Sequence, residues 1–226
     1  PFTSVAADAI AAEQLQAWKL PQSNKKIHSD LRPIAPMMIR FGGIDFEADE
    51  LVGQKLDALI RWAQAIIHEH GGTLLQLTIG DNGAFIYAPF GAPRTYEDNG
   101  QRAMAAALAL QQPPSHLDWL PPLQIGISQG DVWTGLCGAA RRHTYAAIGR
   151  EVNLAARLMA AAEPGQILTT NRVARERRFH TEWIGDKVYK GFADPIPTYV
   201  LLGEETAVKP IFSAPLVGRA SELQTL

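Results

Sequence analysis

The sequence predicts an α+β fold with a ferredoxin-like βαββαβ core, in which helices pack on one face of an antiparallel-dominated sheet. The order of its apolar segments predicts this core, because strand-like and helix-like runs follow one another as strand, helix, strand, strand, helix, strand. The composition agrees, because 46% of the 226 residues are hydrophobic and 19% are charged. A chain of this length and apolar content buries a conventional core and is not disordered.

The first half of the core begins with an apolar run over residues 37–44 that ends at glycines, which predicts a strand. A helix over residues 47–70 follows, and Gly71-Gly72 ends it. Apolar residues at spacings of four, three and four mark its buried face, and they are Leu56, Ile60, Ala63 and Ile67. Residues 73–79 and 84–88 then predict two strands joined by a turn whose Asn-Gly pair accepts positive φ.

The second half of the core begins with a helix over residues 96–112 that is rich in alanine and leucine. A strand over residues 123–128 follows, and residues 130–138 predict a further hairpin. We therefore interpret residues 36–203 as one domain.

The two ends of the chain differ in composition from this domain. Residues 1–35 contain a short helical stretch and break at Pro21 and Pro33, which predicts a linker. Residues 204–226 predict a second linker. Within it, residues 216–223 are similar to the opening of NTPase modules that follow signalling domains in large bacterial regulators. We therefore expect an NTPase module downstream, although residues 216–223 precede any phosphate-binding loop.

Charge and hydropathy exclude several classes of protein. The formal net charge of −2 argues against a chain built to bind nucleic acid or an anionic membrane. The longest apolar run has eight residues, over 103–110, so no membrane span is expected. The single cysteine, Cys137, cannot form an internal disulfide, which fits a reducing compartment. We expect a cytoplasmic protein.

One motif indicates chemistry with phosphate. Over residues 145–158 a strand ends at Gly149 and a helix begins, with Asn153 and Arg157 four residues apart on one helix face. An amide beside a guanidinium can hold a phosphate or a developing oxyanion. The alternative is a capped helix face that contacts only solvent.

This motif, together with residues 124–130 and 135–138, resembles the catalytic domain of class III nucleotidyl cyclases. The resemblance covers residues 37–202, and further family motifs stand in the expected order: Gly71-Gly72, Gly80-Asp81, Phe90-Gly91, Glu163-Pro164-Gly165 and Lys190-Gly191. It implies that two such domains pair head to tail and that each active site takes residues from both.

The resemblance also implies a division of roles between the two domains. One domain supplies two aspartates that bind two Mg²⁺ or Mn²⁺ ions. The other supplies a lysine and a polar residue that read the purine, and an asparagine and an arginine that act on the ribose and the phosphates. The reaction is attack of the ribose 3′ oxygen of ATP on the α-phosphate, with loss of pyrophosphate. Asn153 and Arg157 match the last pair.

The metal positions match poorly. Gly43 stands at the first metal position, and a glycine has no side chain to bind a metal. Asp45 could replace it only if the strand continued, because residues two apart share a face of a strand. Asp81 comes too late after Gly72 and too early before Phe90 for the second metal position, which predicts a place near the tip of a lengthened hairpin.

The purine positions are also altered. Counted from the glycine pair, the lysine position is Gln76; counted from Gly80-Asp81, it is Leu77. Gln76 can still hydrogen-bond to a base edge, whereas Leu77 is more simply a core residue. Ala146 stands at the second purine position and offers no polar group. We therefore expect base selection to depend on the partner domain.

This pattern particularly resembles the second domain of tandem soluble adenylyl cyclases. It implies the complementary, non-metal half of an adenylyl cyclase, whose metal ions are bound mainly by a partner cyclase domain. That partner would lie upstream in the same chain or be a second copy of this fragment, and the isolated fragment is expected to be inactive or very weak. An alternative is a pseudocyclase that dimerises and regulates without chemistry. An RNA-binding module is disfavoured, because the strands lack interleaved basic and aromatic residues.

Overall fold

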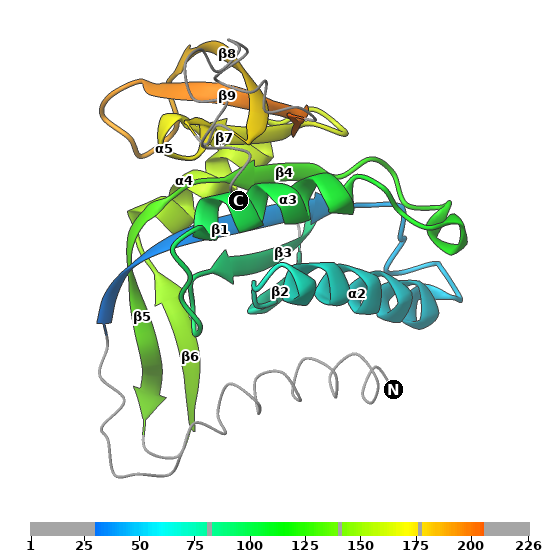
Figure 1. Ribbon diagram of the computed structural model, residues 1–226. Coiled ribbons are helices and arrows are strands. Elements are labelled where there is room, and N and C mark those ends of the chain that lie inside the picture. The colour runs from blue at the N-terminus through cyan, green and yellow to red at the C-terminus, as the bar shows by residue number, and fades with distance from the viewer. Residues whose placement is uncertain (1–29, 81–82, 140–141, 176–177, 206–226) are drawn as a thin grey trace, which may run out of the picture.

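The structure, a computed structural model, describes residues 30–80, 83–139, 142–175 and 178–205 (Figure 1). The described helices are α2 (Val52–Glu69), α3 (Asn99–Leu110), the short 3₁₀ helix η1 (Ser115–Leu117), α4 (Arg150–Ala161) and α5 (Asn171–Ala174). The described strands are β1 (Asp30–Phe41), β2 (Gln76–Gly80), β3 (Gly83–Phe90), β4 (Gln124–Ile127), β5 (Gly130–Ala139), β6 (Arg142–Ile148), β7 (Ile167–Thr170), β8 (Phe179–Lys187) and β9 (Ile196–Glu204).

One mostly antiparallel sheet organises the molecule. Its main path runs β2-β3-β1-β4-β7-β9-β8, and β4 with β7 is the parallel pair in that path. Strands β5 and β6 pair with each other, and β5 also pairs with the first part of β1, so this hairpin projects away from the rest of the sheet (Figure 1). The predicted α+β class and the order βαββαβ from β1 to β4 are confirmed.

Strand β1 is longer at its start and shorter at its end than the sequence predicted. It begins at Asp30, so residues 30–35 belong to the sheet and not to the predicted linker. Pro33 was misread as a break, because it pairs with Asp131 in a part of β1 that has β5 on one side. An edge position tolerates proline, which has no N–H to donate. The remaining linker residues, 1–29 and 206–226, lie outside the described part of the chain.

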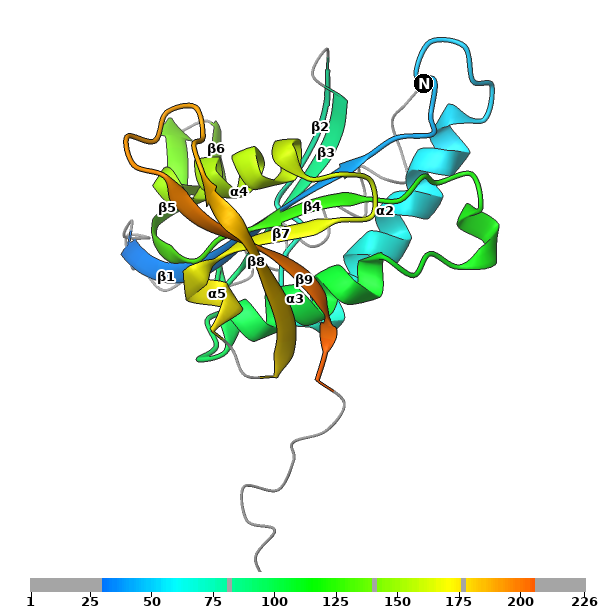
Figure 2. The same cartoon turned by 90° about the horizontal axis from the view of Figure 1, so that it is seen from above.

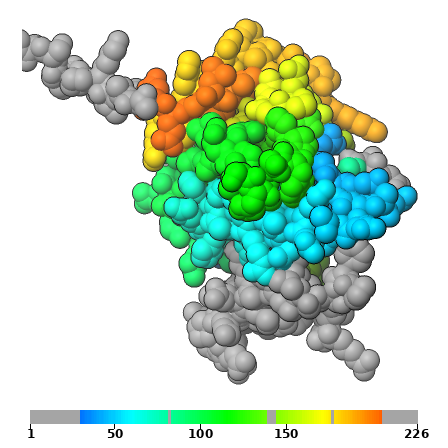
Figure 3. Space-filling view, turned by 90° about the vertical axis from the view of Figure 1, so that its right-hand side faces the viewer, coloured from blue at the N-terminus to red at the C-terminus, as the bar shows by residue number. Residues whose placement is uncertain are grey.

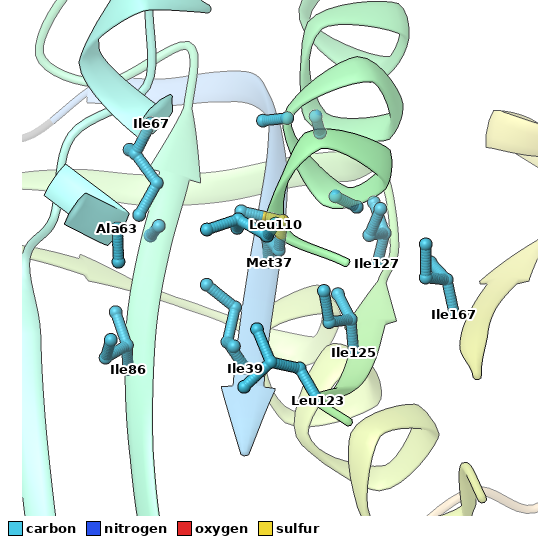
Figure 4. Packing of buried hydrophobic residues seen from close by; sticks show 14 of the residues in the cluster. Met37, Ile39, Ala63, Ile67, Ile86, Leu110, Leu123, Ile125, Ile127 and Ile167 are labelled. Atoms are coloured by element: carbon cyan, nitrogen blue, oxygen red, sulfur yellow. The ribbon is translucent and has the colours of Figure 1, made fainter. Parts of the chain in front are cut away.

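The two faces of the sheet carry different helices (Figure 2). Met37 and Ile39 of β1 contribute to the large core beneath α2 and α3, and Figure 4 shows them among its buried aliphatic side chains. Ile34 and Met38 lie in a second cluster with Ala155 of α4. Both helices of the βαββαβ core thus pack on one face as predicted, whereas α4 packs on the opposite face.

Several predicted boundaries move for local reasons. Helix α2 starts at Val52 and not at residue 47, because a separate turn at Asp49 precedes it. In this turn the Leu51 amide donates to the Asp49 carboxylate, and the Val52 amide donates to the Asp49 carbonyl. Residues 130–138 do not contain a hairpin. They lie in the single strand β5, which pairs with β1 in its first part and with β6 from Trp133 onward. In the described ranges, no helix has the length and apolar content needed to cross a bilayer.

Candidate active site

Helix α4 presents Asn153 and Arg157 on its exposed face. The opposite side of the helix is buried through Leu154, Leu158 and Met159. Asn153 and Arg157 make no side-chain hydrogen bond or ion pair with another residue in the described ranges. The structure therefore leaves an amide and a guanidinium, one turn apart, accessible to a ligand.

Two contacts fix where α4 sits on the sheet. A Cβ at Gly126 of β4 would overlap the backbone oxygen of Ala155 and the backbone nitrogen of Met159, so a glycine is needed for the helix to lie directly on the strand. At the start of the helix, the Ser128 hydroxyl donates a hydrogen bond of 2.7 Å to the Glu151 carbonyl. The orientation of the Asn153 and Arg157 face follows from this packing.

Arg150 is a neighbour of this face that sequence reasoning missed. It lies three residues before Asn153 and seven before Arg157, which places all three on one side of the helix. Its guanidinium carbon lies 4.8 Å from the centre of the Phe192 ring, in the segment between β8 and β9. This cation–π contact holds that segment, which also carries exposed Lys190, against the first turn of α4. The helical spacing of Arg150 from Asn153 and Arg157 was the signal in the sequence that could have identified it.

Glu151 is the half-buried acid beside these cations. Burial raises the pKa of Glu151 above its ordinary value of 4.5, although the charges of Arg150 and Arg172 oppose that shift. Its side chain packs against Gly130, where a Cβ would lie 2.9 Å from the Glu151 Cγ. The first turn of α4 thus holds a half-buried carboxyl group next to an exposed guanidinium.

The two predicted purine positions are connected through Tyr87. Gln76 is exposed on β2 and pairs with Tyr87 of β3. The buried Tyr87 hydroxyl donates a hydrogen bond of 3.2 Å to the carbonyl of Ala147, which is adjacent to half-buried Ala146 on β6. Gln76 donates its own amide to the Thr78 hydroxyl at 3.0 Å. Leu77, the other reading of the lysine position, packs against the main core.

The predicted metal positions do not offer a two-metal ligand set. Gly43 has φ +78°, and a Cβ there would lie 2.5 Å from the Trp119 carbonyl oxygen. Strand β1 ends at Phe41, and the Asp45 carboxylate accepts the amides of Glu47 and Ala48 at 3.0 and 3.1 Å. Asp81 lies outside the described residues. Within the described ranges no three His, Cys, Asp or Glu side chains cluster to hold a metal ion.

An apolar row crosses the exposed face of the projecting hairpin. Trp133 of β5 pairs directly with Leu31 of β1 and with Ile148 of β6, so the three side chains share one face. They are 54% (Leu31), 56% (Trp133) and 59% (Ile148) exposed. Ala146 lies on the same face, two residues before Ile148, opposite Gly135. These three residues, Leu31, Trp133 and Ile148, are called the apolar row below. Exposing their apolar surface to water is energetically unfavourable.

Comparison with known proteins shows the family to which the chain belongs. The family described as "Adenylate and Guanylate cyclase catalytic domain" matches residues 51–203. Adenylate cyclase type 10 of Rattus norvegicus is 28% identical over 180 residues, which cover 77% of this chain and 11% of that protein. The Homo sapiens protein of the same name is 28% identical over 193 residues, covering 82% and 12%. The chain thus spans about one ninth of these relatives.

Solved structures share the fold. The adenylyl cyclase CyaB from P. aeruginosa superimposes with a TM-score of 0.69 at 23% identity, covering 79% of this chain and 98% of that one. The guanylyl cyclase Cya2 superimposes with a TM-score of 0.66 at 26% identity, covering 80% and 97%. The sheet and the placement of the helices are therefore shared with an adenylyl cyclase and a guanylyl cyclase of known structure.

Proposed function

We propose that this chain, which belongs to the family of adenylate and guanylate cyclase catalytic domains, is the complementary half of an adenylyl cyclase. In this role it helps convert ATP to cyclic AMP and pyrophosphate when it is paired with a metal-binding cyclase domain. At the level of the family, the chain is a nucleotidyl cyclase catalytic domain. The assignment to one half of the site and to ATP is the proposal.

The observation that carries the proposal is the contrast between the two parts of the site. Asn153 and Arg157 are exposed and without described partners, on a helix whose position is fixed by Gly126. Gly43 is closed to any side chain and the Asp45 carboxylate is used in a turn. The chain thus offers an amide and a guanidinium on an exposed helix face, but no fitting metal ligands among its described residues. This combination matches one half of a shared site.

The chemistry assigned to this chain uses its own side chains. The Arg157 guanidinium would place positive charge beside the α-phosphate as negative charge develops on it. The Asn153 amide, one turn away, would hydrogen-bond to the ribose and hold the 3′ oxygen in position for attack. Mg²⁺ or Mn²⁺ would be supplied mainly by the partner domain, so no step of this chain is assigned to a metal ion.

The apolar row supports pairing with a second cyclase-type domain. Class III cyclase domains function as dimers. Leu31, Trp133 and Ile148 are large, apolar and half exposed where the projecting hairpin meets β1, on the face that also carries Ala146. Covering them with another domain would remove apolar surface from water and bring the partner's residues to the purine position. Because Ala146 has no polar group, selection of the base would fall largely to that partner.

The test compares cyclic AMP production by the preceding cyclase domain, by this chain, and by the two together. We expect activity above that of either component only in the mixture, and we expect Arg157→Ala to lower turnover on the order of 10²-fold. The matched control is Arg61→Ala, which removes an exposed arginine from α2, distant from α4. No gain on mixing, or full activity of Arg157→Ala, would overturn the proposal.

A pseudocyclase that dimerises and regulates is the second candidate. The closed Gly43 position and the apolar Ala146 favour it. Titration calorimetry of the paired domains with ATP and Mg²⁺ or Mn²⁺ separates the two candidates, because a pseudocyclase would form the pair without binding nucleotide at the site that includes Arg157. A cytoplasmic location and a downstream NTPase module stay predictions.

A further inference from the structure

The loop that follows β1 is closed by a segment from elsewhere in the chain. Gly43 has φ +78°, a left-handed conformation that residues with a Cβ rarely adopt. A Cβ there would lie 2.5 Å from the backbone oxygen of Trp119 and 2.8 Å from Pro121 Cδ. One obstacle is backbone and the other belongs to a proline ring, so neither can turn aside as a flexible side chain would.

The Trp119 segment is itself held in place. The Lys55 ammonium lies 5.5 Å from the centre of the Trp119 ring, and it also pairs with the Asp49 carboxylate at 2.6 Å. Leu117 is fully buried, and the Leu120 amide donates to the Leu117 carbonyl at 2.9 Å. Figure 3 shows this segment, in green, packed against α2 in cyan, with the blue loop after β1 beside it. Moving the segment to admit a side chain at position 43 would disturb these contacts.

We propose that position 43 is a packing position that excludes every side chain, so that a metal-binding carboxylate cannot be restored there by a single substitution. Gly43, Lys55, Trp119 and Pro121 form a clamp over the end of β1, and this clamp occupies the space that an aspartate side chain would need. The identification of position 43 with the family's first metal position rests on the proposed function. The closure of position 43 follows from contacts within this chain and does not depend on the proposed function.

The clamp and a simple loss of the metal ligand predict opposite effects of Gly43→Asp on Mn²⁺ binding. If only the carboxylate were missing, Gly43→Asp would restore an oxygen ligand and raise the affinity for Mn²⁺. With the clamp in place, Gly43→Asp must take a strained φ and push against the Trp119 carbonyl. It should therefore weaken folding and give no gain in Mn²⁺ binding. Asp45 does not relieve this, because its carboxylate already accepts two backbone amides.

The experiment measures urea unfolding and Mn²⁺ binding of the 226-residue chain without any partner. Gly43→Ala should raise the unfolding equilibrium constant on the order of 10²-fold, through the strained φ and the overlap together. The control is Gly185→Ala, at φ +106° with no atom within 4 Å of its Cβ, which carries the conformational strain alone. We expect this control to raise the constant about tenfold.

Two outcomes would overturn the proposal: equal destabilisation by Gly43→Ala and Gly185→Ala, or a folded Gly43→Asp variant that binds Mn²⁺ more tightly than the wild type. If Gly43→Asp does not fold, the comparison of the two alanine variants still decides. Because no partner domain or nucleotide is present, a failure of the proposed cyclase role would leave this measurement unaffected.

Discussion

The carboxyl group of Glu151 is restrained at the helix turn that precedes Asn153. Its side chain is 16% exposed and packs against Gly130, and burial raises the pKa of Glu151 above its ordinary value of 4.5. Arg150 and Arg172 oppose the shift without cancelling it. Folding therefore favours the protonated form of this group, and ionisation at higher pH carries a free-energy cost in the folded state.

This shift predicts a pH dependence that Glu151→Gln removes. Below pH 4.5 both folded and unfolded chains hold the proton, and the stabilisation is fully present. As the pH rises through the folded pKa, the unfolded chain binds fewer protons, so the stabilisation is lost. We expect the free energy of unfolding of Glu151→Gln, relative to wild type, to increase with pH above 4.5 and then level off, as measured by urea titration at several pH values.

The control for this measurement is Glu182→Gln, which changes an exposed carboxyl group on β8. This control removes a carboxyl group without removing the buried contact on which the prediction for Glu151 rests. A difference for Glu151→Gln that is independent of pH would contradict the argument from burial.

At the scale of elements, the contact between α4 and β4 determines where the candidate catalytic face lies. Gly126 lets the helix backbone rest on the strand, with Ile125 and Ile127 turned to the core on the other face of the sheet. One added methyl group would separate helix from strand along their whole contact. The position of Arg157 thus depends on a buried glycine between helix and strand.

Gly126→Ala should therefore destabilise the domain by about 3 kcal/mol, the upper part of the usual range for overpacking. In the paired assay it should also lower activity beyond the loss of folded protein, because α4 and Arg157 must move. Gly203→Ala is the matched control in β9, where a Cβ would meet nothing within 4 Å. Urea unfolding of both variants checks the prediction, and equal stability of the two would refute it.

The elements also show which features could be read from the sequence. The spacing of Leu56, Ile60, Ala63 and Ile67 predicted the buried face of α2, because helical periodicity is local. The spacing of Asn153 and Arg157 predicted a shared face of α4 for the same reason, and the structure places both on its exposed side.

What the sequence could not predict depends on contacts between distant segments. The Trp119 carbonyl closes Gly43, and the Tyr87 hydroxyl meets the Ala147 carbonyl across 60 residues. No periodicity within a strand encodes such pairs. Pro33 was misread because the edge position that tolerates it exists only once β1 pairs with β5.

For the whole molecule, the main consequence is that the domain has its own core, whereas the proposed active site would be completed by a partner. Among the described residues, three hydrophobic clusters fill the interior of the domain, and they form without a partner. The exposed apolar row lies outside those clusters, as does Arg157, which has no side-chain partner in the part of the chain that the structure describes. We therefore expect that a substitution can abolish assembly with a partner, and with it catalysis, without affecting the folding of the domain.

Trp133→Glu tests that separation, because it places a charge in the middle of the apolar row without entering the core. We expect the variant to keep wild-type stability within about 0.5 kcal/mol, as surface substitutions do. Its association with the metal-binding cyclase domain should weaken about 30-fold or more, the loss expected for a central aromatic anchor. Sedimentation of the mixed domains measures this directly.

Two controls separate assembly from other effects. Trp183→Glu changes a tryptophan of similar exposure, 58%, on β8, away from the projecting hairpin, and should leave association unchanged. Arg157→Ala should assemble normally while losing turnover, because in the proposed role its side chain acts on the nucleotide and not on the partner domain. If Trp133→Glu assembles as well as Trp183→Glu, the apolar row is not the surface that meets the partner, and the pairing geometry proposed for this domain is wrong.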